Sequence, residues 1–313
     1  YGQYKGIPTA SGWRFQSKIG VYYPQISLEN IATAWSTPYS LTSSTINNWI
    51  GEELRNTGIN IKFEKLGKAT KSPHSVSLEL DVFQNNDSAG AMLSWHGWTV
   101  GSRQTLLSER LIVQDFPARN GMLAEQAAES DPFIELDNRW GVNVTGQWRY
   151  QNKFKMSVGF YDNQAEKGLV ENGQYTWTTS FIHAGFKYQI TKGWELVGHY
   201  MSGSTLMTSP TFIRVVDNDF DSQFLMLRRF WGKHHIALRI EDFNVDDRDE
   251  TLGDNNNESG NALSFAYRYS LNRQNFLLAE YTAVDSHRAS RQYQHQPIKL
   301  KEQQYQVAYR YYF

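Results

Sequence analysis

The sequence contains no cysteine among its 313 residues. This absence excludes a disulfide framework and a thiolate metal site. The sequence also lacks any run of about 18 apolar residues, which excludes a transmembrane helix. The formal net charge is only −1 and no segment is strongly basic, so nucleic acid is not an expected partner.

Aromatic residues are abundant although the chain is polar on average. Tryptophan, tyrosine and phenylalanine make up 14% of the residues, while the mean hydropathy is −0.58. This pair of values is unusual for a globular enzyme. It is typical of a transmembrane β-barrel, because only the outer face of a barrel is apolar and aromatic girdles mark both membrane interfaces.

Apolar and polar residues alternate along most of the chain with a period of two. In the final segment Tyr305, Val307 and Tyr309 share one face, whereas Gln306 and Arg310 share the other. Such alternation predicts a strand with an apolar side toward lipid and a polar side toward a wet lumen. We predict strands at residues 1–7, 13–22, 55–66, 75–82, 139–150, 154–161, 177–190, 193–203, 220–231, 234–245, 261–270, 275–285 and 304–313. The adjacent Arg228 and Arg229 leave the register of segment 220–231 open.

The connections between these segments are alternately short and long, with the longest loops at about 25–54 and 86–138. Short periplasmic turns and long extracellular loops are the arrangement of outer-membrane barrels. The fold class predicted for residues 1–313 is therefore all-β. We expect one transmembrane antiparallel β-barrel of the porin type in the outer membrane of a Gram-negative bacterium.

The number of strands poses a question about the barrel. A final strand that ends at Phe313 and runs into the periplasm gives thirteen segments when they are counted back, whereas single-chain bacterial barrels have even numbers. Either residues 1–7 are not a strand, which leaves twelve, or further strands precede Tyr1. Because Tyr1 opens directly into strand-like sequence, we favour the second alternative, with about 14 or 16 strands in all.

One segment carries a family resemblance. A strand at Ile19–Tyr23 is followed by Pro24, by Ser27-Leu28-Glu29-Asn30, by a long loop and by a strand from Gly58. This pattern resembles the phosphate-selective porin family and its uncharacterised relatives. The resemblance implies about sixteen strands and a trimer. The lysine ladder of true phosphate channels is not evident here, so phosphate selectivity is not carried over.

Side chains expected to face the lumen carry more positive than negative charge. The basic ones are Arg14, Lys18, Lys62, Arg149, Lys155, Lys187, Arg239, Arg268 and Arg310, and the acidic ones are Glu64, Glu79, Asp81, Glu195, Glu241 and Glu280. Basic rings in a narrow aqueous path favour anions, so these residues predict a pore lining with weak anion preference. The alternative is that opposite charges simply pair across the barrel wall.

The loop at 25–54 has the composition of a constriction that folds into the barrel. It carries Trp35, Tyr39, Trp49, Glu52 and Glu53. Its end, residues 44–54, predicts a short helix capped by Ser44 or Thr45. The alternative for this loop, and for the loop at 86–138, is an extracellular lid packed on its neighbours.

Catalysis is the main competing class of function. Barrel lipases need a serine, a histidine and an orienting polar group close together, and His183 with Ser180 or His199 with Ser202 are candidates. Each is a single coincidence of spacing, so no enzyme activity is expected.

No cofactor is expected, with loop calcium as the one alternative. Carboxylates in loops bind Ca²⁺ when several oxygen atoms converge. The acidic groups are Asp217, Asp219 and Asp221, then Asp246, Asp247, Asp249 and Glu250, and finally Asp254 with Glu258. None has the spacing of a calcium-binding loop, so solvated loops are the simpler interpretation.

The sequence therefore predicts a passive diffusion channel for small polar or anionic solutes. Expected partners are outer-membrane lipid, lipopolysaccharide and two further copies of the chain in a trimer. The alternatives are a non-conducting barrel that acts as an adhesin, receptor or scaffold, and a lipid-modifying enzyme. The residues expected to anchor the barrel at the membrane interfaces are Trp13, Trp140, Trp148, Tyr309, Tyr311 and Phe313.

Overall fold

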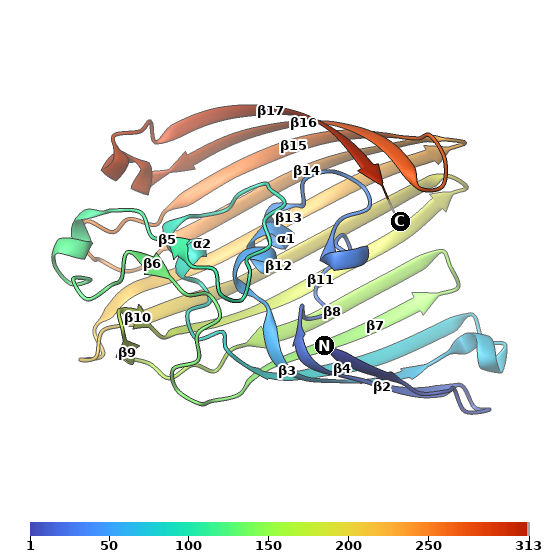
Figure 1. Ribbon diagram of the computed structural model, residues 1–313, viewed down its shortest axis with the longest axis horizontal. Helices are drawn as coiled ribbons and strands as arrows, with labels where there is room; N and C mark the ends of the chain where they lie inside the picture. Colours follow the sequence, from blue (N-terminus) through green and yellow to red (C-terminus); the bar gives the residue numbers. More distant parts are fainter. Residues whose placement is uncertain (312–313) are drawn as a thin grey trace.

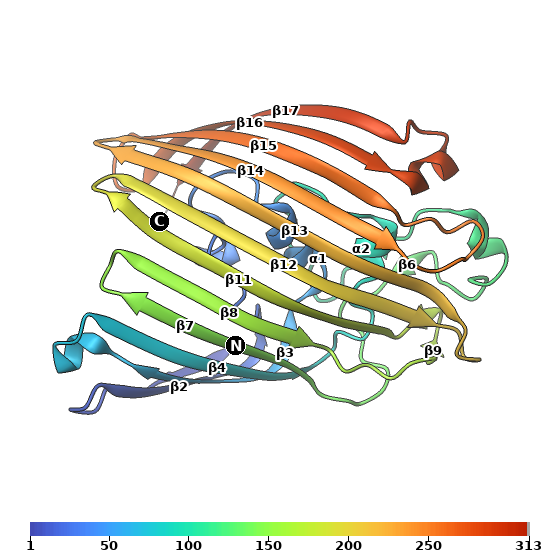
Figure 2. The ribbon, with the colours of Figure 1, turned by 180° about the vertical axis from the view of Figure 1, so that it is seen from behind.

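The computed structural model of the protein describes residues 1–311. Its main element is one large antiparallel sheet that curves into a barrel wall (Figures 1 and 2). Strands that neighbour one another in this sheet follow in chain order, and each pair is antiparallel. The strands are β1 (Gly2–Lys5), β2 (Trp13–Tyr22), β3 (Asn56–Lys65), β4 (His74–Gln84), β7 (Gly141–Tyr150), β8 (Phe154–Asp162), β11 (Trp177–Thr191), β12 (Trp194–Thr208), β13 (Arg214–Trp231), β14 (His234–Asp247), β15 (Glu258–Ser270), β16 (Asn275–Arg288) and β17 (Lys299–Tyr311).

The remaining elements lie in the connections. The helices are α1 (Thr45–Glu53) and α2 (Ala91–Trp95), and the 3-10 turns are η1 (Thr33–Trp35), η2 (Gly67–Thr70), η3 (Pro117–Asn120) and η4 (Ala289–Gln294). Two small hairpins pair β5 (Leu111–Ile112) with β6 (Glu129–Ser130) and β9 (Val170–Glu171) with β10 (Gln174–Tyr175). Within residues 1–311, none of the helices has the length and apolar character needed to cross a bilayer.

The predicted barrel class is confirmed, and all thirteen predicted segments are strands of the 13-stranded sheet. Several strands continue further toward the long-loop end than predicted, such as β12, which runs on to Thr208. There the outward residues change from apolar to polar, as at Asp219 and Asp242, so the sequence contrast that marks a strand disappears.

The two ends of the sheet do not meet in the described part of the chain. There β1 pairs with β2 alone and β17 pairs with β16 alone. The sheet is thus open between β1 and β17. Phe313, which is predicted to end the last strand and to anchor it at the membrane interface, lies outside the described residues.

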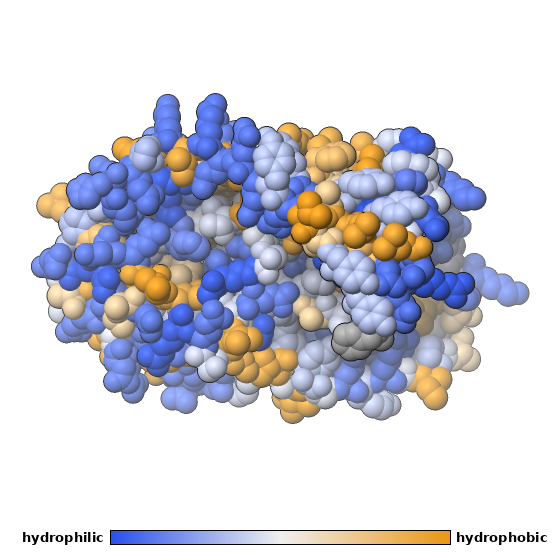
Figure 3. Space-filling model, turned by 45° about the horizontal axis from the view of Figure 1, so that its top comes forward, coloured by the Kyte–Doolittle hydropathy of each residue, from blue (hydrophilic) through white to orange (hydrophobic). Residues whose placement is uncertain are grey.

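An outward aromatic girdle runs around the short-turn end of the wall. Trp148 is 5.5 Å from Phe154, whose ring is 6.3 Å from Tyr188, as measured between ring centroids. Figure 3 shows mostly hydrophilic side chains, with small apolar patches, over the long-loop half and a larger gathering of apolar side chains toward the short-turn half. Of the predicted interface anchors, those within residues 1–311 are all well exposed: Trp13, Trp140, Trp148, Tyr309 and Tyr311.

The open register of the 220–231 segment is resolved by what its two arginines touch. Arg228 points inward, where its Nη1 pairs with Glu195 and its guanidinium lies 3.5 Å from the ring centroid of Tyr39. Arg229 points outward, and its guanidinium lies 4.8 Å from the ring centroid of Trp194. A cation–π contact in the aromatic girdle lets this arginine stand at the membrane interface.

Candidate functional site

The connection between β2 and β3, residues 23–55 (loop 1), folds into the barrel rather than over its mouth (Figure 1). Its helix α1 is buried at every position. The side chain of Ser44 accepts a hydrogen bond from the backbone N–H of Asn47, which caps the helix as predicted. The lumen is therefore divided by a loop of the same chain.

A buried arginine on the barrel wall holds loop 1 in place. Arg239 of β14 is 1% exposed; its Nη1 lies 2.7 Å from Glu29 Oε1 and its Nε lies 2.6 Å from Glu241 Oε1. Its guanidinium also donates to the carbonyl oxygens of Thr42 and Ser43 at 3.0 and 3.1 Å. Charge-assisted bonds of this kind are about twice as strong as neutral ones.

Two wall carboxylates complete this contact. Glu241 Oε2 accepts from the backbone N–H of Thr45 at 2.8 Å, and Glu280 Oε1 accepts from the backbone N–H of Thr42 at 3.1 Å. We call Arg239, Glu29, Glu241 and Glu280 the arginine latch. Because the latch holds main-chain atoms of residues 41–45, it fixes the path of loop 1 and not merely a side chain.

Loop 1 is joined to the long connection between β4 and β7, residues 85–140 (loop 2), through Glu53. The carboxylate of Glu53 accepts hydrogen bonds from Trp49 Nε1 at 2.5 Å and from the backbone N–H groups of Gly90 and Met92 at 3.1 and 2.9 Å. Burial raises the pKa of Glu53 to about 7 against the effect of these donors. Loop 2 therefore packs into the lumen behind loop 1.

Aromatic side chains fill the space between the two loops and the wall. The ring centroid of Trp49 lies 5.8 Å from Trp98, 5.5 Å from Phe181 and 5.2 Å from Phe220. All four residues belong to one buried apolar cluster. Apolar side chains fill this side of the lumen, and open space lies on the other side of loop 1.

A cleft of about 890 Å³ lies on that other side, between loop 1 and strands β2 and β8. Its charged lining consists of Lys18, Arg55 and Lys155. A smaller cleft of about 440 Å³ shares Gln104 with it and contains Arg310 from β17. Among the described residues that line the two clefts, none is acidic.

Lys155 is the centre of positive charge in this region. It interacts electrostatically with Arg149, Lys62 and Lys187. Each of these three neighbours has a carboxylate within 4 Å, whereas Lys155 has none within residues 1–311. We call Lys18, Arg55 and Lys155 the basic cleft.

The predicted pore-lining charges lie on the inward face of the sheet, but they divide into three groups and one separate residue, Asp81. Arg14, Lys62, Glu64, Glu79, Arg149, Lys187 and Glu195 form ion pairs across the wall. Arg239, Glu241, Glu280, Arg268 and Arg310 contact loop 1. Lys18 and Lys155 face the basic cleft, and Asp81 is buried against Asn60 and Asn143. That these residues line a solute path stays a prediction.

The predicted constriction residues of loop 1 also have different surroundings. Trp35 stacks on Tyr23 with ring centroids 4.2 Å apart, at the edge of the basic cleft. Tyr39 accepts a hydrogen bond from Lys187 Nζ at 3.2 Å. Glu52, Trp49 and Glu53 are all buried, and Glu52 lies 3.7 Å from His96. Only Trp35 of these five lines the cleft.

Sequence reasoning missed Arg55, whose guanidinium lies 4.8 Å from the ring centroid of Tyr23 and donates to its hydroxyl at 2.6 Å. Arg55 is the residue before β3, where alternation begins and a face cannot be assigned. The one feature of the sequence that could have pointed to Arg55 is a basic residue at the end of a loop that is expected to enter the lumen.

The paired residues considered for catalysis do not come together. In a strand, residues three apart point to opposite faces, and this separates His183 from Ser180 on β11 and His199 from Ser202 on β12. The two histidines point inward, are buried, and have no hydrogen-bond partner within the described chain. Neither serine can therefore be activated by its proposed histidine.

The acidic groups considered for calcium are partly neutralised by arginines. Arg214 lies 2.8 Å from Asp217, and Arg248 pairs with Asp219. A different trio that the sequence did not suggest, Asp87, Glu135 and Asp137 in loop 2, brings carboxylate oxygens within 4.8 Å of one another. Backbone N–H groups bind all three carboxylates, and burial with the two neighbouring charges raises the pKa of Asp87 to about 7. Loop calcium stays a prediction.

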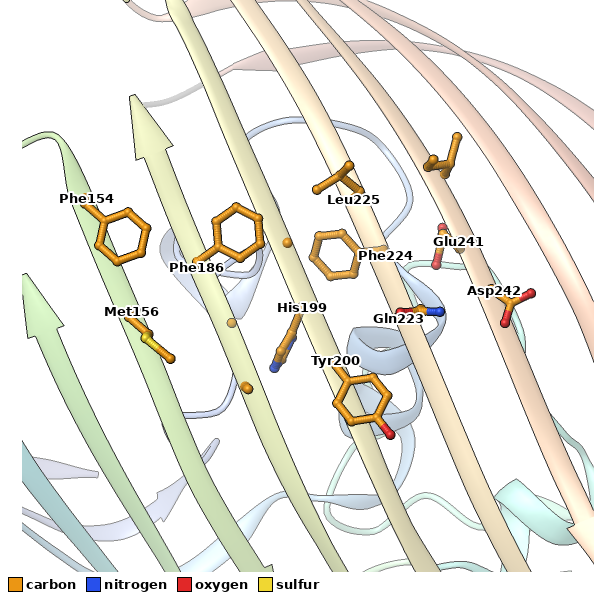
Figure 4. Close-up of a pocket in the computed structure, with 14 residues that line it drawn as sticks. Phe154, Met156, Phe186, His199, Tyr200, Gln223, Phe224, Leu225, Glu241 and Asp242 are labelled. Atoms are coloured by element: carbon orange, nitrogen blue, oxygen red, sulfur yellow. The ribbon is translucent and has the colours of Figure 1, made fainter. Parts of the chain in front are cut away.

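A groove of about 830 Å³ on the outer wall lies apart from these lumenal features (Figure 4). Phe154, Met156 and Tyr200 line it, and the ring of Phe186 covers Gly198, whose added Cβ would lie 2.5 Å from that ring. Since the side chains of Phe154, Met156 and Tyr200 face away from the lumen, the groove opens on the membrane-facing surface.

No family model matches the chain, and no curated protein matches it. Among solved structures, OmpT folded in vitro, an outer membrane protein of Vibrio cholerae, is 11% identical with a TM-score of 0.50, covering 97% of this chain and 77% of that one. An anion-selective porin from Comamonas acidovorans is 10% identical with a TM-score of 0.35, covering 74% of this chain and 80% of that one. The P. putida toluene transporter TodX is 10% identical with a TM-score of 0.31, covering 74% and 69%. The first likeness agrees with the barrel fold, and the two lower scores support no further conclusion.

Proposed function

We propose that this chain is an outer-membrane channel through which small anionic or polar solutes diffuse without chemical change. The observation that carries the proposal is the basic cleft, which contains Lys18, Arg55 and Lys155 and no acidic side chain among its described lining residues. The fold likeness to an outer membrane protein of Vibrio cholerae supports the predicted outer-membrane location.

The division of the lumen supports a narrow path rather than a wide one. The arginine latch holds loop 1 against β14 and β16, on the far side from the basic cleft. A solute would then pass between loop 1 and the wall at β2 and β8. A basic constriction next to a low-dielectric core concentrates the field that attracts anions. The path needs neither a cofactor nor catalytic chemistry.

The finer predictions from the sequence belong to this proposal. They are a trimer, contact with lipopolysaccharide, and kinship with the phosphate-selective porin family. The cations of the basic cleft come from two strands and a loop end rather than from a ladder, so the proposal names small anions as a class and not phosphate.

A second candidate is a non-conducting barrel that serves as a receptor or scaffold. The observation in its favour is the amount of lumen filled by α1, α2 and their aromatic cluster. Purified protein in a planar bilayer separates the two. Stepwise ohmic conductance supports the channel, and silence under the same conditions supports the scaffold.

Neutralising the basic cleft is expected to remove anion preference. In a potassium chloride gradient, the reversal potential of the wild type should indicate chloride preference. The triple variant K18Q/R55Q/K155Q should shift this potential toward zero or to cation preference, because the lumenal carboxylates remain. The matched control K192Q changes an exposed lysine in the turn after β11 and should leave the potential unchanged. Equal potentials for wild type and triple variant would contradict the assignment of the cleft.

A further inference from the structure

A second lumenal cavity, of about 510 Å³, lies at the long-loop end between loop 2 and the inner faces of β15, β16 and β17. We call it the vestibule pocket. Its polar lining combines two arginines and several glutamines with two carboxylates. The arginines and glutamines are Arg288, Arg291, Gln114, Gln294, Gln296, Gln303 and Gln304, and the carboxylates are Glu258 and Glu302. It is separate from the basic cleft, with which it shares no lining residue.

Arg288 is a buried cation with unused hydrogen-bonding capacity. The residue is 7% exposed, and its Nε donates to Ser290 Oγ at 2.8 Å. Its Nη2 has no hydrogen-bond partner in the described chain, and no carboxylate lies within 4 Å of the guanidinium there. Glu258 is the nearest counter-charge and favours the charged form of Arg288 without a direct ion pair. A buried donor without an acceptor is costly, so such a group is expected to meet an acceptor that comes from outside the chain.

The backbone of loop 2 is shaped to leave room for this guanidinium. Gly97 has φ +79°, and a Cβ there would lie 2.6 Å from Arg288 Nη1 and 2.2 Å from Glu258 Oε2. A glycine is therefore required both by its conformation and by the closeness of the arginine. The next residue, Trp98, donates its backbone N–H to Glu258 Oε2 at 3.0 Å, so this carboxylate has a partner other than Arg288.

Arg291 supplies a second, fixed guanidinium. Its Nη2 donates to Ser286 Oγ at 2.8 Å, and its Nη1 lies 3.3 Å from the carbonyl oxygen of Ile298. Planar guanidinium groups bind carboxylates through parallel hydrogen bonds. Glutamine amides both donate and accept, which is what recognition of sugar-like hydroxyl groups requires.

We propose that the vestibule pocket binds a small polyhydroxy carboxylate, such as a sugar acid. The carboxylate meets the guanidinium of Arg288, with Arg291 beside it, and the hydroxyl groups meet the glutamine amides. The inference rests on the proposed function in that solutes enter from the long-loop end, and it adds a capture site ahead of the basic cleft.

Calorimetry on the full chain in detergent tests the pocket with sodium gluconate as the probe. We expect gluconate to bind, and both glucose and acetate to bind at least about tenfold more weakly, because each lacks one half of the recognised chemistry. Equal binding of glucose would overturn the role of the arginines, and equal binding of acetate would overturn the role of the glutamines. No binding of gluconate would overturn the proposal.

Variants assign the binding to named side chains. R288Q should weaken gluconate binding about tenfold or more, and R288K should retain an intermediate affinity. K299Q removes an exposed outward lysine from the same end of β17 and should bind gluconate as the wild type does. If R288Q does not fold, Q304A replaces it, with a smaller loss expected. Unchanged affinity in the folded arginine variant, or in Q304A when it is used, would overturn the site.

Bilayer recordings keep this inference distinct from the proposed function. Gluconate binding by a protein that is silent in bilayers would leave the pocket in place and refute the channel. Anion-selective conductance without gluconate binding would leave the channel in place and refute the pocket.

Discussion

Replacing Arg239 by methionine is expected to free loop 1 from the barrel wall and to cause the largest loss of stability of any single lumenal change. The substitution leaves Glu29 and Glu241 buried without their cation. Breaking a buried ion pair by removing one partner costs about 3–5 kcal/mol. Thermal unfolding in detergent should show a lower transition temperature, and bilayer recordings should show larger, noisier conductance steps as loop 1 leaves its place.

A charge-balanced variant distinguishes the latch from simple packing. E29Q/R239M/E241Q removes the uncompensated charges together, so it should recover much of the stability lost in R239M. R229M is the matched control, because Arg229 faces outward over Trp194 and its cation–π contact contributes about 1 kcal/mol. An R239M protein as stable as R229M would show that the latch does not hold loop 1.

The strands could be predicted because their two faces meet unlike surroundings. Within the membrane-facing half, outward residues such as Leu238 and Ile240 alternate with inward Arg239 and Glu241, and the contrast marks both the strand and its register. Further along β14, toward its long-loop end, Asp242 and Asn244 also face outward. Polar residues on the outer face remove the contrast between the two faces of a strand. Several strands were therefore predicted to stop too early at the long-loop end.

The arrangement of the lumen could be predicted only in part, because it depends on contacts between residues far apart in the chain. The sequence identified loop 1 and its helix, since Ser44 and the composition of the loop are local signals. It could not show that Thr42 meets Glu280, which lies 238 residues away. It also treated Arg239 and Lys155 as equivalent lumenal cations, whereas one is sealed under loop 1 and the other faces the basic cleft.

The joint between the two lumenal loops is expected to weaken as pH rises. The ordinary pKa of a glutamate, 4.5, is raised to about 7 at Glu53 because the carboxyl is buried. Between these values the folded state holds a proton that the unfolded state has lost. Stability from this group is therefore complete below about pH 4.5 and falls as pH rises through about 7. The whole change is on the order of 3 kcal/mol.

Comparison of E53Q with the wild type isolates this contribution. Burial also raises the pKa values of Asp87 and Asp254 to about 7, so the stability of the wild type should fall from pH 5 to pH 8 for more than one reason. The free energy of unfolding of E53Q, measured in urea, should still fall from pH 5 to pH 8 because of these aspartates. The fall should be smaller than in the wild type because the Glu53 contribution is lost. E52Q changes the neighbouring buried carboxylate, which lies beside His96 and has only a small effect on the pKa of Glu53, so it should keep most of the Glu53 part of the slope. If E53Q and wild type have the same slope, Glu53 remains ionised across this range, because the N–H groups of Gly90, Met92 and Trp49 outweigh the cost of its burial.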